Sequence, residues 1–120
     1  NSNLPKLLKI SNKHKNIIIH KNVSNMAEIM TKCDIAVSAC GSTMYELCAC
    51  GLPIIAYSFA DNQLDGIRKF DEKEIVINCG DIRNKINGVI SKVILYLKIF
   101  IENSHLRKEY SQKAYNLLNE

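Results

Sequence analysis

Short apolar segments alternate with helix-like segments along the chain, and this alternation constrains the fold more than any other feature. Each apolar segment is only about four residues long and lacks the polar alternation of a half-exposed strand, which is typical of strands buried on both faces of a parallel sheet. The four segments are Ile17–His20, Ile35–Ser38, Ile54–Tyr57 and Ile75–Asn78. We therefore predict an α/β fold with a Rossmann-like, doubly wound parallel sheet.

Helices are predicted before, between and after these strands, from apolar residues at helical spacing. Ser24 or Asn25 would cap the second of them. The first expected helix ends near Leu8, and the next three span Met26–Lys32, Thr43–Cys50 and Gln63–Phe70. A long amphipathic helix is expected from Ile82 to Leu97, and a final helix spans Leu106–Leu118.

Length and composition predict one folded domain, residues 1–120, because 47% of the residues are apolar and 23% are charged. The net charge is +4, but lysine outnumbers arginine 13 to 3, so we expect no nucleic-acid partner. The most apolar run, Val93–Ile101, is broken by Lys98 and is far shorter than the roughly 20 residues of a membrane span. We expect a cytoplasmic protein.

The five cysteines do not form a recognisable framework. Their number is odd, and no C-x-x-C pair occurs, so neither a disulfide set nor a zinc site is expected. Free thiols in a reducing compartment are the ordinary interpretation. The cysteines are Cys33, Cys40, Cys48, Cys50 and Cys79.

The loop after the second apolar segment is the first candidate binding site. Residues 39–53 read ACGSTMYELCACGLP, a small-residue loop that enters a helix, which Gly51 closes before Pro53 opens the next strand. Unpaired N–H groups at such a helix start favour an anion, and Glu46 could accept hydrogen bonds from hydroxyl groups. Equally, Thr43 and Glu46 fit a capping box, and Gly41 could serve only the turn.

The loop after the third apolar segment is the second candidate. The amides of Asn62 and Gln63 suit sugar hydroxyls or a phosphate oxygen, whereas Asp61 or Asn62 could simply cap the following helix. Both loops follow the carboxyl ends of parallel strands, where α/β sheets bind ligands, so they should face one crevice. No histidine is paired with a nucleophile, and no catalytic residue is predicted.

Residues 33–66 resemble the C-terminal domain of GT-B nucleotide-sugar enzymes. The family includes the N-acetylglucosaminyltransferase of peptidoglycan synthesis, and the stronger similarity is to the UDP-sugar hydrolase of pseudaminic acid biosynthesis and the spore-coat polysaccharide biosynthesis protein G group. The shared pattern is a small residue, Gly-Ser-Thr-x-x-Glu, Gly-x-Pro and Asn-Gln. Here it consists of Gly41, Ser42, Thr43, Glu46, Gly51, Pro53, Asn62 and Gln63.

The resemblance implies a role for each loop. Glu46 would bind the ribose hydroxyls of UDP, and the Gly41–Thr43 segment would hold the diphosphate, with Cys40 standing where relatives often have a glycine. Asn62 and Gln63 would contact the sugar or the β-phosphate. The loop Lys21–Val23 would lie near uracil, which adds Val23 to the binding residues. No cofactor or metal is implied, because helix dipoles would stabilise the departing UDP.

The resemblance also implies a larger enzyme. GT-B enzymes have two domains, and the first strand of this domain and the N-terminal domain with the hydrolase's acid–base histidine have no counterpart in residues 1–120. We expect the UDP-sugar-binding half of a bacterial polysaccharide or nonulosonic-acid enzyme that hydrolyses a UDP-linked amino sugar, inactive without its other domain or a partner subunit. The alternatives are a glycosyltransferase of the same fold and a non-catalytic nucleotide-binding subunit.

Overall fold

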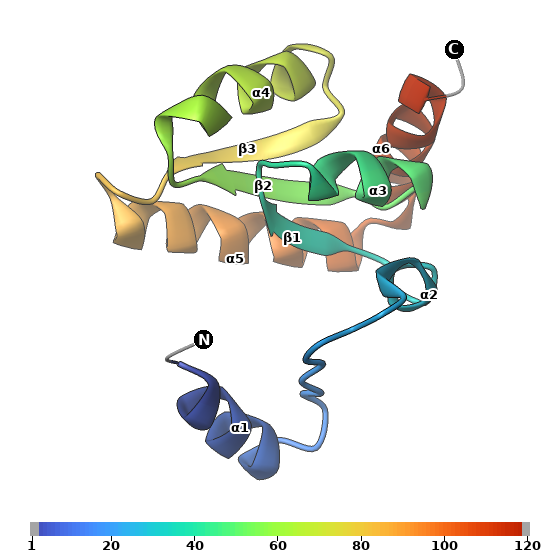
Figure 1. Ribbon diagram of the computed structural model, residues 1–120. Coiled ribbons are helices and arrows are strands. Elements are labelled where there is room, and N and C mark those ends of the chain that lie inside the picture. Colours follow the sequence, from blue (N-terminus) through green and yellow to red (C-terminus); the bar gives the residue numbers. More distant parts are fainter. Residues whose placement is uncertain (1–2, 119–120) are drawn as a thin grey trace.

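Three parallel strands form the centre of the fold, and the computed structural model describes residues 3–118 around them. The strands are β1 (Ala36–Ala39), β2 (Ile54–Ser58) and β3 (Val76–Asp81), and they lie side by side in the order β1-β2-β3 (Figure 1). Both pairs are parallel. The α/β class and the parallel sheet predicted from the sequence are therefore confirmed.

The described part of the chain contains six helices. Helices of about the predicted extent occur at all the predicted places, and none of those described is both long and apolar enough to cross a membrane. They are α1 (Leu4–Lys13), α2 (Met26–Met30), α3 (Thr43–Ala49), α4 (Asp61–Glu72), α5 (Ile86–Glu102) and α6 (Ser104–Leu118).

The sheet is covered on both faces. Helices α3 and α4 pack on one face, and α5 packs on the other (Figure 1). The first face is filled by side chains such as Met44, Ile54 and Phe70, and the second by side chains such as Ile55 and Phe100. Because neighbouring residues of a strand point to opposite faces, adjacent Ile54 and Ile55 contribute to different cores.

One predicted strand is wrong: Ile17–His20 has no regular secondary structure and belongs to no sheet. A single strand has no partner for its backbone groups, so β-branched residues alone do not produce one. The side chain of Ile18 is 75% exposed. Strand β1 is consequently at the edge of the described sheet, with Val37 exposed.

Gly51 ends α3 as the sequence predicts. Its φ is +66°, the left-handed conformation that favours glycine after a helix, and the Leu52 N–H donates to the Leu47 carbonyl at 3.2 Å. The Ser111 hydroxyl, on α6, donates a hydrogen bond to the Gly51 carbonyl. The end of α3 is therefore attached to the last helix of the chain.

Candidate functional site

The loops that follow β1, β2 and β3 gather at one edge of the sheet, where α3, α4 and α5 begin (Figure 1). The Cys40 N–H donates to the Tyr57 carbonyl at 2.8 Å, which joins the first loop to the end of β2. The Arg83 guanidinium donates to the Asp61 carboxylate at 2.8 Å, which joins the third loop to the start of α4. The loops thus lie together along the carboxyl edge of the sheet, as expected for loops that follow parallel strands.

The first loop presents unpaired backbone donors. The Met44 and Tyr45 N–H groups bond back to the carbonyls of Gly41 and Ser42, at 3.1 and 3.3 Å. Within residues 3–118, the N–H groups of Gly41, Ser42 and Thr43 donate to no protein group. All three residues are exposed. Three consecutive free donors at a helix start favour an anion such as a phosphate.

The alternative capping box is not formed. Ser42, not Thr43, occupies the N-cap position, its φ of −60° is helical, and no side chain caps the helix. Glu46 is exposed, and its carboxylate has no hydrogen-bond or ion-pair partner in the part of the chain that the structure describes. A carboxylate one turn into α3 is therefore available to a ligand.

The surroundings of Gly41 leave room for a ligand. A β-carbon added at Gly41 would meet nothing within 4 Å, so the packing of the chain gives no steric reason for glycine there. The neighbouring Cys40 thiol is buried and faces Gly66 of α4, 3.5 Å from where a β-carbon would lie. Burial raises the pKa of the Cys40 thiol, which favours its neutral form.

In the second loop, one of the two predicted amides has a structural task. The Gln63 side-chain oxygen accepts a hydrogen bond from the Phe59 N–H at 2.8 Å, which fixes the loop. Asn62 is exposed on the first turn of α4. Neither Asp61 nor Asn62 is the helix cap, since Ala60 occupies that position without a side-chain bond. Of the two amides, that of Asn62 has no hydrogen-bond partner among the described residues.

Arg83 belongs to this edge, and sequence reasoning missed it. Its Nη2 lies 2.7 Å from the Asp81 carboxylate and 2.8 Å from that of Asp61, and its Nε also donates to Asp81 at 3.0 and 3.1 Å. Hydrogen bonds from Arg83 lower the pKa of Asp81 below its usual range. The signal was an Asp-x-Arg sequence directly after a buried strand.

Ser58, the last residue of β2, was also missed. Its side chain is 1% exposed, and its hydroxyl is the only buried side-chain polar atom without a hydrogen-bond partner among the residues that the structure describes. Buried hydroxyls are normally paired, so this group suits a water molecule or a ligand atom. Nothing in an apolar strand sequence distinguishes such a serine beforehand.

Val23 is not brought to the carboxyl edge. It lies in the segment that leads from α1 into α2, and α2 lies near the other end of the sheet, where β1 begins (Figure 1). Among the described residues, no hydrogen bond or ion pair joins the Lys21–Val23 loop to Glu46. No group of three or more His, Cys, Asp or Glu side chains able to hold a metal occurs among the described residues.

Comparisons with known proteins give one similar protein and no family. The chain is 40% identical over 52 residues to an uncharacterized protein of Methanocaldococcus jannaschii. The matched segment is 43% of this chain but only 11% of that protein. No family model matches the chain, and no solved structure matches it.

Proposed function

We propose that this chain is the UDP-sugar-binding half of a GT-B enzyme for the synthesis of a bacterial polysaccharide or a nonulosonic acid. The proposal rests on the resemblance of residues 33–66 to that family. One structural observation carries it further: three free N–H groups, at Gly41–Thr43, lie on the same short segment as the unpartnered Glu46 carboxylate. A nucleotide sugar requires both an anion site and a hydroxyl acceptor.

The arrangement suggests a role for each group. The Gly41–Thr43 N–H groups would bind the diphosphate, and the open space beside Gly41 would let it approach the backbone closely. Glu46 would accept two hydrogen bonds from the ribose diol. The exposed Asn62 amide would contact the sugar, while Gln63 would keep its loop in place.

In the full enzyme, water would attack the anomeric carbon of a UDP-linked amino sugar, and UDP would leave. A base must take the proton of that water, and no histidine lies in the loops that follow the strands. His14 ends α1, His20 lies in the segment before α2, and His105 lies in α6. We therefore assign the base to a second domain or subunit. A glycosyltransferase of the same fold would use the same nucleotide site with a sugar or lipid acceptor.

Calorimetric titration of UDP into the wild-type chain and the Glu46→Gln variant tests this proposal. Loss of two charge-assisted hydrogen bonds should weaken UDP binding by at least about tenfold. The melting temperature should not change, because Glu46 makes no contact that stabilises the fold. Millimolar UDP is needed, because residues 1–120 would supply only half of the proposed binding site.

Glu102→Gln is the matched control, because it removes an equally exposed carboxylate at the end of α5. Its UDP affinity should equal that of the wild type. Equal affinity of the Glu46→Gln variant and the wild type would contradict the assignment of Glu46, and no binding at millimolar UDP would contradict the nucleotide site as a whole.

A further inference from the structure

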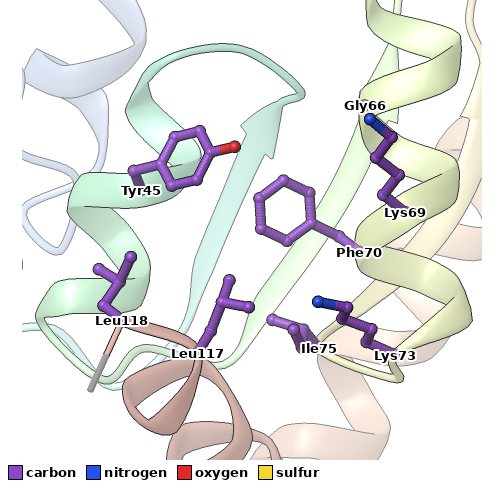
Figure 2. A pocket seen from close by; sticks show the side chains of 8 residues that line it. All are labelled: Tyr45, Gly66, Lys69, Phe70, Lys73, Ile75, Leu117 and Leu118. Atoms are coloured by element: carbon purple, nitrogen blue, oxygen red, sulfur yellow. The ribbon is translucent and has the colours of Figure 1, made fainter. Parts of the chain in front are cut away.

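A second concave site lies away from the carboxyl-edge loops, between α3, α4 and the C-terminal end of α6. It is a groove of about 330 Å³, in the size range of small-molecule sites. Figure 2 shows the side chains that surround it. We call it the α3/α4 groove. It is lined by Tyr45, Lys69, Phe70, Lys73, Leu117 and Leu118, among others.

Much of the lining of the α3/α4 groove is apolar. The ring of Tyr45 packs edge-on against that of Phe70, with centroids 5.6 Å apart. Leu117 and Leu118 face these rings from the end of α6 (Figure 2). Leu118 remains 44% exposed, so the groove has apolar surface that the fold itself does not cover. An apolar ligand body would gain by covering it.

Two lysines supply positive charge along one side. Lys69 lies in the last turn of α4, Lys73 is the C-cap residue that follows this helix, and both line the groove (Figure 2). Neither ammonium group has an ion-pair or hydrogen-bond partner within the described part of the chain. None of the described residues that line the groove is acidic. Nearby Lys113, in contrast, is paired with Glu74 at 3.0 Å.

We propose that the α3/α4 groove binds a small organic anion with an apolar body. The anionic group would lie between Lys69 and Lys73, where its charge complements theirs. The aromatic or aliphatic body would pack on Phe70 and Leu118. The inference does not depend on the proposed nucleotide site, because it uses other residues and another side of α3 and α4.

A fluorescent probe of matching chemistry tests the groove: anilinonaphthalene sulfonate, an aromatic anion, with the uncharged phenylnaphthylamine as its neutral counterpart. The folded chain should bind the anion. Lys69→Gln with Lys73→Gln should weaken that binding by about tenfold or more while changing phenylnaphthylamine binding less than about twofold.

Lys92→Gln with Lys98→Gln is the charge-matched control, because it removes two exposed lysines from α5, on the other face of the sheet. The control should bind the anion within about twofold of the wild type. Equal weakening in both double variants would show that only net charge matters and would overturn the proposal.

A second pair of variants locates the probe. Leu118→Glu places a negative charge in the groove and should abolish binding, whereas Leu95→Glu on α5 changes an equally exposed leucine elsewhere and should not. Thermal melts confirm that both variants fold. UDP should not displace the probe. Displacement by UDP, or loss of binding in Leu95→Glu but not in Leu118→Glu, would contradict a separate site in this groove.

Discussion

The backbone conformation of Gly51 and the atoms packed next to it both favour a residue without a β-carbon. Its φ of +66° is strained for a residue with a β-carbon, and a β-carbon there would lie 3.3 Å from the Ser111 hydroxyl oxygen. Gly51→Ala should therefore destabilise the fold by about 1–2 kcal/mol, measured by chemical denaturation.

Gly88→Ala is the control for this prediction. Gly88 lies within α5, its φ is not positive, and an added β-carbon would have only an ordinary 3.7 Å contact with Lys85. Because alanine is the better helix former, this variant should be as stable as the wild type or more stable by up to about 1 kcal/mol. Similar losses in both variants would refute the backbone explanation.

At the candidate site, sequence reasoning located residues correctly where their position after a strand sets their place in the fold. The small-residue loop of Gly41 and the Asn62 loop could be placed together because both follow parallel strands. Arg83 and Ser58 could not be found in this way. Arg83 stands out only because its guanidinium binds two carboxylates, one of which lies on α4. Ser58 stands out only because its buried hydroxyl has no hydrogen-bond partner among the described residues.

Among the elements, α1 contributes least to the fold. It has no buried residue, and Figure 1 shows it apart from the sheet and the other helices. Removal of residues 1–13 should change the free energy of unfolding by less than about 1 kcal/mol. Removal of residues 104–120 should prevent folding, because Ala114 and Leu117 of α6 belong to the core. A large loss from the first truncation would contradict this description of α1.

The sequence predicts correctly those elements whose buried residues form a clear apolar pattern within the element itself. Strands β1 to β3 follow from short apolar runs, each joined to the next by a helix. The segment Ile17–His20 is a similar short apolar run, but no strand lies beside it to pair with its backbone. A local sequence pattern does not show whether such a neighbouring strand exists. Helix α5 begins at Ile86 instead of Ile82, because β3 continues to Asp81 through Gly80, whose φ is +103°, and a turn follows.

At the scale of the whole molecule, burial in the two cores, one on each face of the sheet, predicts which cysteine thiols react slowly. All five cysteines are unpaired, as expected, and Cys40, Cys48 and Cys79 are buried while Cys33 is exposed. Burial raises the pKa of the Cys48 thiol to about 11, so little reactive thiolate exists near neutral pH.

An aromatic disulfide reagent at about pH 8 should label Cys33 first and the three buried thiols only as fast as the fold opens. In denaturant all five cysteines should react. Rapid labelling of Cys48 in the native chain would mean that the core around it opens readily. A count of three or fewer in denaturant would instead reveal disulfides.

The bond from Ser111 to Gly51 joins residues 60 positions apart, and Ala114 is fully buried on the same helix. The three strands, by contrast, are sequential neighbours whose paired residues are only 18 to 23 positions apart. During synthesis on the ribosome, β1, β2 and β3 can therefore assemble early, but α3 lacks its final support until α6 has left the exit tunnel. Translation that stops before residue 104 would leave a nascent chain with an open apolar face, a substrate for chaperones and proteases.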